Sequence, residues 1–373
     1  MCNFINNAYV HVRFTRFIFI KFQKMKRITY LLLVFITSSF YVIAQNNTPV
    51  IKSLKDVESA KAGVSNYWLE MGTNTYGYPL LIPVVVVQGA TKGPVLGLTA
   101  AIHGNELNGI PIIHKLIDSI DTNKLKGRII AIPGLNAVSI QMDERRFIDD
   151  EDLNRNFPGK ANGNRSEQYV EKIKERILPF FNIHIDMHTA SFGRINSMYA
   201  RVDVANDTLE MLAKLQKPDI ILNSKGAPSV GSVASSSHTM RAESGLKGIP
   251  SITVEYGDPQ VFQKELTLRG YHGILNTLSW LKMYGKNDLQ NFIDDAINCK
   301  KSYWLYMKEG GFLDVIVDIN QKIKKGDKIA LVKNAFGILI REYFAPEDGI
   351  VIGKSTNPAN MSGGRIIHLG IVN

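Results

Sequence analysis

Two histidines and a glutamate stand in two short motifs whose residue types could hold a catalytic metal ion. His103 and Glu106 lie three residues apart in the segment His-Gly-Asn-Glu, and His188 belongs to the segment Asp-Met-His-Thr. Neutral imidazoles and a carboxylate suit Zn²⁺, and three protein ligands leave a fourth position open for water. Taken alone, the first motif is just as compatible with an ordinary turn in which Glu106 begins a helix, where the helix dipole favours a negative charge.

A third motif places a carboxylate at the end of an apolar strand. Glu255 follows Ile-Thr-Val and precedes Tyr-Gly. Such a carboxylate is unfavourable unless it has a partner or a chemical role. Glu255 is therefore a candidate general base that takes a proton from metal-bound water, and the alternative is an ion pair within the sheet. His184 lies four residues before His188, farther from the strand end, and we interpret it as a packed histidine.

The segment 145–159 is dense in charged residues but is not repetitive, which argues against a simple solvated face. Arg146 and Arg155 could bind a substrate carboxylate in a bidentate manner or polarise a carbonyl group. Asn154 could donate a hydrogen bond to the same carboxylate, and Asp152 could hold one of the arginines in place. The segment is therefore a candidate for substrate binding.

The elements that must position these motifs alternate between strands and helices. Short, β-branched apolar runs indicate strands covered on both faces, and apolar residues at helical spacing indicate helices between them. The expected strands are 81–87, 95–100, 128–133, 181–186 and 251–255, and the expected helices are 106–120, 166–177 and 262–284. Ser166 is a candidate N-cap of the second helix. This alternation predicts an α/β fold with a mixed, mostly parallel sheet flanked by helices, whose active site gathers at the C-terminal ends of the strands.

After about residue 300 the pattern changes to short apolar runs separated by turn sequences. This change predicts a smaller C-terminal all-β domain, and a chain of 373 residues with 45% apolar content is long enough for two domains. The predicted division is an N-terminal extension and signal peptide over 1–44, a domain with the candidate zinc site over 45–295, and the β domain over 296–373.

The formal net charge of +10 suggests a nucleic-acid binder, but the distribution of charge argues against that class. Residues 1–44 hold six basic residues and no acidic ones, which leaves 38 basic against 34 acidic residues in the rest of the chain. This small excess is ordinary for a soluble domain and provides no basic field for phosphates. No nucleic acid is expected as a partner.

The N-terminal segment has the order of features of a signal peptide. Met25-Lys26-Arg27 precedes an apolar run over 28–36, and Ala44 precedes a polar stretch. We therefore expect an exported, periplasmic or extracellular protein, with residues 1–24 as an upstream extension. The alternative is a retained membrane anchor, but 28–44 is only 17 residues, whereas a spanning helix needs about 20.

The two cysteines limit the redox and metal chemistry of the chain. Cys2 lies in the expected leader, so the mature chain would keep only Cys299. An intramolecular disulfide and a cysteine-based metal site are then excluded by count. Cys299 has no nearby histidine, and we interpret it as a packing residue.

In their order along the chain, four motifs resemble those of the succinylglutamate desuccinylase/aspartoacylase family, which has a zinc carboxypeptidase-like fold. The motifs are His-Gly-Asn-Glu, Asp-Leu-Asn-Arg, Asp-Met-His-Thr and Thr-Val-Glu-Tyr-Gly, and the resemblance covers about residues 75–285. It implies that His103, Glu106 and His188 bind one Zn²⁺ per chain. It also implies that Glu255 activates water and passes the proton to the leaving amine.

The resemblance implies substrate-binding residues as well. Asn154 and Arg155 match the pair that binds the carboxylate of the substrate. Arg146 matches the arginine that polarises the scissile carbonyl, although one extra residue separates it from Asp-Leu-Asn-Arg. This departure from the family spacing leaves Arg145 as a substitute candidate.

Two further matches are weaker in spacing. Arg241 matches a second substrate-facing arginine, but it lies farther from the catalytic glutamate than family spacing implies. Tyr343 is a candidate for the tyrosine that family members take from their C-terminal region. Residues 302–370 resemble the barrel-sandwich shape of biotinyl and lipoyl domains without a carrier-lysine motif, which favours a structural lid at the pocket entrance.

These features together predict a zinc-dependent amidohydrolase, or deacylase, that cleaves an N-acyl amino acid or a related small molecule with a carboxylate. One alternative is an exported zinc carboxypeptidase that acts on peptides or cell-wall peptides, which the N-terminal segment favours. Another is a metal-binding protein without catalysis, which the presence of all three ligand candidates and Glu255 disfavours. The membrane would be a partner only through an uncleaved N-terminal segment.

Overall fold

The computed structural model describes residues 48–225, 237–285 and 295–372. From Val50 onward the chain forms one compact unit. The predicted extension and signal peptide over 1–44 lie outside the described residues. Among the described helices, none is long and apolar enough to cross a membrane.

The framework is a 14-stranded sheet in the order β1-β2-β3-β5-β4-β6-β10-β8-β9-β11-β18-β16-β13, with β7 paired to β16. Its strands up to residue 256 are β1 (Val50–Ile51), β2 (Gly63–Thr73), β3 (Pro79–Gln88), β4 (Thr91–Ala100), β5 (Lys126–Ile132), β6 (Ile183–His188), β7 (Arg194–Asn196), β8 (Met198–Val202), β9 (Ile220–Asn223) and β10 (Ser251–Tyr256). β5, β4, β6 and β10 run parallel to one another, whereas β3 pairs antiparallel with β5 and β8 pairs antiparallel with β10. The predicted mixed α/β sheet is confirmed.

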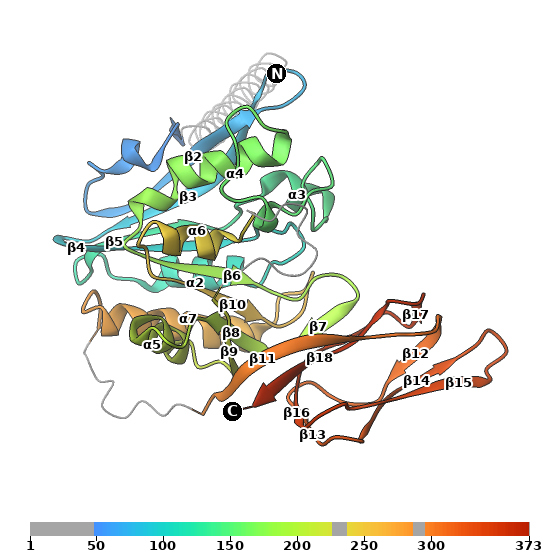
Figure 1. Ribbon diagram of the computed structural model, residues 1–373. Helices are drawn as coiled ribbons and strands as arrows, with labels where there is room; N and C mark the ends of the chain where they lie inside the picture. The colour runs from blue at the N-terminus through green and yellow to red at the C-terminus, as the bar shows by residue number, and fades with distance from the viewer. Residues whose placement is uncertain (1–47, 226–236, 286–294, 373) are drawn as a thin grey trace, which may run out of the picture. The chain divides into compact units, whose positions relative to one another are not determined.

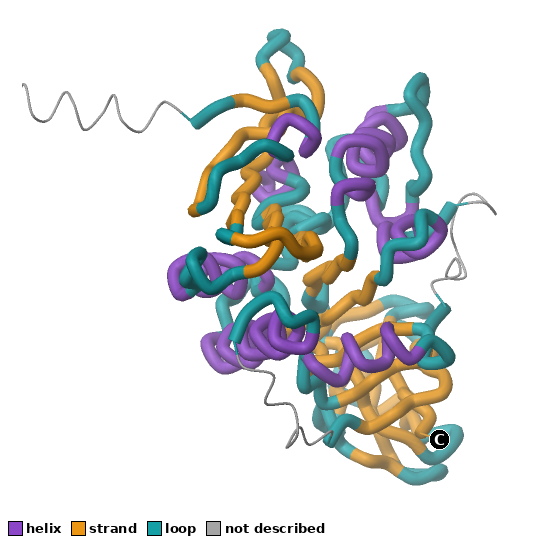
Figure 2. The backbone as a smooth tube through the Cα atoms, turned by 90° about the vertical axis from the view of Figure 1, so that its left-hand side faces the viewer, coloured by secondary structure: helices purple, strands orange, loops and turns teal. Residues whose placement is uncertain are grey.

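Helices cover both faces of the sheet, which explains the continuous apolar runs in the sequence (Figures 1 and 2). They are α2 (Gly109–Ser119), α3 (Ala137–Met142), α4 (Arg165–Arg176), α5 (Asp207–Leu215), α6 (Met240–Leu246) and α7 (Lys264–Trp280), with short 3₁₀ helices η1 (Leu54–Val57), η2 (Leu153–Arg155) and η3 (Leu178–Phe180). In β5, Ile129 and Ala131 pack into the core with α2, α5 and α7. Ile130 and Ile132 pack into the opposite core with α4 and α6. Alternate residues of one strand thus belong to different cores.

One predicted helix start and one predicted N-cap are wrong. The helix expected over 106–120 is α2, which begins only at Gly109. Glu106 therefore lies in the turn between β4 and α2. Ser166 is not the N-cap of α4. Asn164 takes that role, because its side chain accepts the N–H of Glu167 and the Glu167 carboxylate accepts the N–H of Asn164.

The region after residue 296 consists of strands among the described residues, as predicted. They are β11 (Ile297–Tyr306), β12 (Gly311–Val315), β13 (Lys322–Ile323), β14 (Lys328–Lys333), β15 (Leu339–Phe344), β16 (Gly349–Ser355), β17 (Ala359–Asn360) and β18 (Arg365–Val372). β12, β14, β15 and β17 form a separate four-stranded sheet. β11 pairs with β9, and β16 pairs with β7, so the main sheet continues into this region. The domain boundary after residue 295 therefore stays a prediction.

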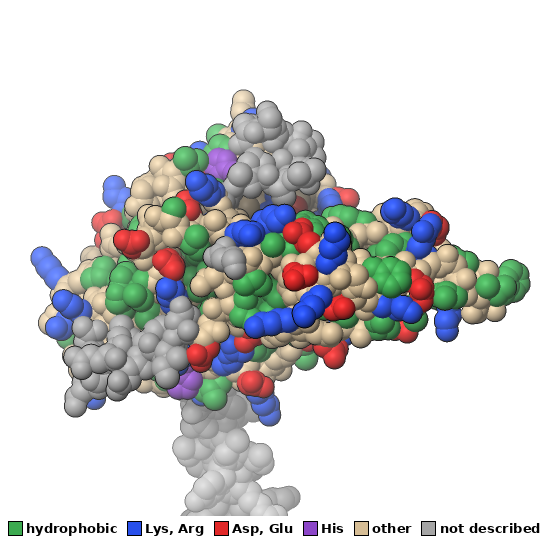
Figure 3. Space-filling view, turned by 60° about the horizontal axis from the view of Figure 1, so that its bottom comes forward, with side chains coloured by type: hydrophobic (Ala, Val, Ile, Leu, Met, Phe, Trp, Pro, Cys, Tyr) green, Lys and Arg blue, Asp and Glu red, His purple; other side chains and the backbone are tan. Residues whose placement is uncertain are grey.

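The surface has mixed charge. Figure 3 shows basic and acidic side chains interspersed over one face, with apolar side chains between them. Arg145, Arg155 and Arg201 differ from this pattern, because they gather around one site.

Candidate active site

Parallel pairing brings the chemistry-bearing motifs to one edge of the sheet. β6 lies between β4 and β10, and His188 is in register with Glu255. Residues in register on neighbouring parallel strands share a face of the sheet. The turn that carries His103 and Glu106 directly follows β4, so it lies beside the C-terminal ends of β6 and β10.

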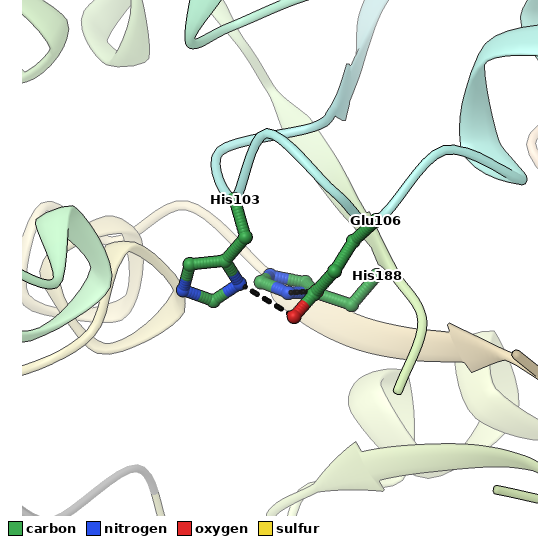
Figure 4. Close-up of side chains that lie close together, drawn as sticks. All are labelled: His103, Glu106 and His188. Atoms are coloured by element: carbon green, nitrogen blue, oxygen red, sulfur yellow. Dashed lines mark hydrogen bonds and ion pairs between the residues drawn. The ribbon is translucent and has the colours of Figure 1, made fainter. Parts of the chain in front are cut away.

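The side chains of His103, Glu106 and His188 form a compact, buried cluster. One potential ligand atom from each lies within 4.8 Å of the others. Nδ1 of His103 lies 3.0 Å from Oε1 of Glu106, and Nδ1 of His188 lies 2.9 Å from Oε2 (Figure 4). The three residues are only 2–3% exposed. The carboxylate thus stands between two imidazole nitrogens and is shielded from water.

Each imidazole has a second carboxylate behind it. Nε2 of His103 lies 2.9 Å from Asp152, and Nε2 of His188 lies 2.7 Å from Asp186. We assign the ring proton to Nε2 in both residues, because each Nε2 has its own carboxylate to accept a hydrogen bond, whereas the two Nδ1 atoms share the single carboxylate of Glu106. Each Nδ1 then presents a lone pair toward Glu106, which is the arrangement of metal-ligating histidines held by outer carboxylates.

These residues fit a divalent cation. Nδ1 of His103 is buried and forms no hydrogen bond with any residue in the described part of the chain. A lone pair on nitrogen facing a carboxylate oxygen is repulsive unless a cation lies between them. Burial alone would lower the pKa of His188, but Asp186 and Glu106 raise it well above its usual value. The cluster therefore favours a positive charge at its centre, and its donor set of two nitrogens and a carboxylate suits zinc.

Arg145 lies against this cluster. Nη1 donates to Oε1 of Glu106 at 2.5 Å and to the hydroxyl of Ser191, and Nη2 donates to Asp152 at 3.0 Å. Burial alone would raise the pKa of Glu106, but His103 and Arg145 hold it well below its usual value. The guanidinium therefore helps to keep the carboxylate of Glu106 ionised.

Arg146, which the family resemblance matched to the arginine at the scissile carbonyl, is not brought to the cluster. Its side chain is 54% exposed, and Nη1 donates to the backbone oxygen of Asp150 at 2.6 Å. The neighbouring Arg145 occupies the place that the sequence assigned to Arg146. Two adjacent arginines in a turn direct their side chains differently, and the substitute candidate is the one that reaches the site.

Asn154 and Arg155 lie at the 3₁₀ helix η2, which Asp152 caps by accepting the N–H of Asn154. Asn154 is buried, with Nδ2 3.4 Å from Nε2 of His188 and Oδ1 accepting the N–H of Met240. Arg155 is half-buried and donates to the backbone oxygen of Asn154 at 2.7 Å. Burial lowers the pKa of Arg155, Asp152 opposes this shift, and the charge of Arg145 adds to it. Both residues thus border the cluster.

Glu255 faces an arginine that the sequence analysis missed. Nε of Arg201 lies 3.8 Å from Oε1 of Glu255, and their side chains are 31% and 12% exposed. Arg201 belongs to β8, which was not among the predicted strands. The alternation of Tyr199 and Arg201 with apolar neighbours in Met-Tyr-Ala-Arg-Val is a strand signal that could have identified it.

Three remaining predictions concern residues outside the cluster of His103, Glu106 and His188. Arg241, at the start of α6, donates to the backbone oxygen and to the hydroxyl of Ser224, and burial with the nearby charge of Arg201 lowers its pKa to about 10. The hydroxyl of Tyr343 accepts the N–H of Lys308 in the separate four-stranded region. Cys299 is buried in the core, as expected of a packing residue.

Residues 92–281, just over half of the chain, match the model of the succinylglutamate desuccinylase/aspartoacylase catalytic domain. The chain therefore belongs to the succinylglutamate desuccinylase/aspartoacylase family, as its motifs indicated. The matched range contains both ligand motifs and Glu255.

Curated relatives match over shorter segments. The chain is 31% identical over 111 residues to the N-alpha-acetyl-L-2,4-diaminobutyric acid deacetylase of Halomonas elongata, covering 30% of this chain and 32% of that protein. It is 29% identical over 141 residues to the succinylglutamate desuccinylase of Pseudomonas aeruginosa PAO1, covering 35% of this chain and 39% of that protein. The matches thus span about a third of the length of these relatives.

Solved structures share the fold over most of the chain. A succinylglutamate desuccinylase from Silicibacter and the product-bound ectoine utilization protein EutE (DoeB) from Ruegeria pomeroyi both have a TM-score of 0.73 at 20% identity. Each comparison covers 84% of this chain and 96% of the other. The likeness includes the C-terminal β region, since the coverage extends well beyond the catalytic segment.

Proposed function

We propose that the protein is a zinc-dependent hydrolase that cleaves the amide bond of an N-acyl amino acid or a related substrate with a carboxylate. The observation that carries the proposal is the buried cluster of His103, Glu106 and His188, with Glu255 in register beside it. Family membership supports it, and so do relatives named as a deacetylase and a desuccinylase.

The three clustered residues would hold one Zn²⁺ per chain. Such an ion supplies Lewis acidity and lowers the pKa of a bound water toward about 7. Asp152 and Asp186 fix the orientation of the two imidazoles through their Nε2 atoms. Mutation of such outer carboxylates weakens metal affinity in comparable sites.

Glu255 is the proposed proton carrier. Its carboxylate takes a proton from the attacking water and gives it to the leaving nitrogen, so that the products are a carboxylate and an amine. Arg145 stabilises the negative charge that develops on the carbonyl oxygen, because its guanidinium lies within the cluster. Arg146 does not take this role, since it is bonded to Asp150 at the surface.

The charge around the site favours an anionic substrate. Arg145, Arg155 and Arg201 all lie within electrostatic range of Glu255. Asn154 and Arg155 are the proposed contacts for the substrate carboxylate, and Arg241 is a third candidate. A guanidinium binds a carboxylate through two parallel hydrogen bonds, which would fix the substrate relative to the cluster.

Export of the protein is also part of the proposal, and it rests on the N-terminal sequence alone. An exported enzyme of this family could meet peptides rather than acylated amino acids. Zinc carboxypeptidase activity is therefore the second candidate function.

The test compares substrates on the zinc-loaded chain and on Glu255→Gln. We expect hydrolysis of N-acetyl or N-succinyl amino acids, and a loss of about 100-fold or more in Glu255→Gln with unchanged zinc content. Glu210→Gln, on the exposed side of α5, is the matched control. Cleavage of peptides alone would select the carboxypeptidase, and wild-type turnover in Glu255→Gln would reject the mechanism.

A further inference from the structure

The strand β8 brings a second pair of side chains to the catalytic glutamate. β8 runs antiparallel to β10, with Tyr199 in register with Glu255 and Arg201 in register with Thr253. Residues two apart on a strand share a face, so Tyr199 and Arg201 lie on the face of Glu255. Neither has a role in the proposed function beyond the general charge of the site.

Arg201 joins Glu255 to Tyr199. Its Nε lies 3.8 Å from Oε1 of Glu255, and its Nη2 donates to the Tyr199 hydroxyl at 2.7 Å. The centre of the guanidinium also lies 5.0 Å from the centre of the Tyr199 ring. A guanidinium held on two sides keeps little rotational freedom, so it can fix the carboxylate that it faces.

The C-terminal β region supports Tyr199 from behind. Tyr199 is 2% exposed, and its ring meets His368 of β18 edge-on, with centroids 6.3 Å apart. His368 stacks on Trp304 of β11 at 5.1 Å and 10°, and its Nε2 lies 2.8 Å from the hydroxyl of Ser302. The stack thus connects the C-terminal region to the catalytic glutamate through Tyr199.

We propose that Arg201, held by Tyr199 against the C-terminal β region, is a positioning residue that aims the carboxylate of Glu255 at the metal cluster. The proposal rests on the function of Glu255 proposed above. A glutamate has three rotatable side-chain bonds, and fixing it before the reaction removes an entropic barrier from the chemical step. Because Arg201 acts through Glu255, its loss reduces kcat rather than substrate affinity.

The kinetic test is a double-mutant cycle with the zinc-loaded protein. We expect Arg201→Met to lower kcat roughly 10- to 100-fold with KM changed less than about twofold. Arg201→Lys should restore part of kcat, and Tyr199→Phe, which only removes the acceptor, should lower it less than Arg201→Met. In a Glu255→Gln background, Arg201→Met should cause no further loss. A raised KM with unchanged kcat, or full additivity with Glu255→Gln, would overturn the proposal.

A second measurement does not depend on turnover. In crystal structures of the zinc-loaded protein, we expect the Glu255 carboxylate of Arg201→Met to shift by about 1 Å or more, or to occupy several positions. Arg341→Met is the matched control, because it removes the exposed ion pair with Glu309 in the separate four-stranded region. If the Glu255 carboxylate does not move in Arg201→Met, the positioning role is refuted, whether or not the wild-type protein hydrolyses a substrate. If the wild-type protein hydrolyses no substrate, only the proposed function is refuted.

Discussion

The start and the end of β6 carry one histidine each, and the two residues have opposite electrostatic environments. His184 is fully buried, and its hydrogen-bond partners within the described part of the chain are hydroxyl groups, with those of Thr99 and Ser251 each at 2.9 Å. Burial lowers its pKa to about 4. His188, four residues later on the same face, is 3% exposed but has carboxylates on both ring nitrogens, and its pKa is raised.

Burial alone therefore does not make a histidine a metal ligand. Hydroxyl partners satisfy a neutral imidazole completely, because one hydroxyl can accept from Nε2 and another can donate to Nδ1. Carboxylate partners instead leave an excess of negative charge that a cation must balance. The end of the strand therefore favours a bound cation, whereas its start does not.

Replacing each histidine is the largest test of this comparison. We expect His188→Ala to lose its zinc and about a thousandfold or more of kcat/KM. His184→Ala should keep one zinc per chain and lose stability instead, since it leaves a cavity and takes one hydrogen-bond partner from each of two buried hydroxyls. Elemental analysis of the purified variants, with chemical unfolding, measures both effects. Loss of zinc from both variants would contradict the proposal that His188 binds the metal and His184 does not.

Asp186→Asn tests the role of the outer carboxylate beside His188. The amide keeps the shape of the side chain but removes the charge that orients His188 through Nε2. We expect zinc affinity to fall about 10- to 100-fold, as titration against a competing chelator would show. Asp219→Asn is the control, because Asp219 pairs with Arg269 away from the cluster. If Asp186→Asn and Asp219→Asn bind zinc equally tightly, the carboxylate of Asp186 has no role in metal binding.

The low pKa of His184, at the start of β6, makes the stability of the fold sensitive to pH. The group has a pKa of about 4 in the folded chain against an ordinary value of 6.5. Below pH 6.5 the unfolded chain binds a proton that the folded chain does not, so stability falls as the pH drops from 6.5 to about 4. The slope should approach about 1.4 kcal/mol per pH unit from this group alone.

Removing the group gives the control for this pH dependence. Urea unfolding of the metal-free wild type and of His184→Gln at several pH values measures the slope. The variant should show a shallower loss between pH 6.5 and 4. Parallel curves for the two proteins would mean that His184 is not held neutral in the fold.

The smallest expected effect concerns Thr99, whose side chain contacts both His184 and Asp186. Its hydroxyl donates to Oδ1 of Asp186 at 2.8 Å and lies 2.9 Å from Nε2 of His184. We expect Thr99→Val to cost about 1–3 kcal/mol of unfolding free energy, because two buried polar atoms lose a partner. Its effect on zinc affinity should be smaller than that of Asp186→Asn. Thr91→Val, at the exposed start of β4, is the matched control and should change neither quantity.

Much of the catalytic architecture follows from local sequence information. Apolar periodicity indicated strands β3, β4, β5, β6 and β10 and helices α2, α4 and α7, because both faces of these strands are buried. It did not indicate α3, α5 or α6. His103, Glu106 and His188 could be chosen as candidates because each stands where a strand ends. Their residue types alone determined which metal they could suit.

The tertiary structure decided what depends on side-chain direction and on pairing between distant segments. Arg145 and Arg146 are neighbours in sequence, yet Arg145 donates to Glu106, whereas Arg146 donates to the backbone oxygen of Asp150. Arg201 meets Glu255 only because β8 pairs with β10. A sequence specifies residue types and local periodicity directly, whereas the register between strands results from the packing of the whole core.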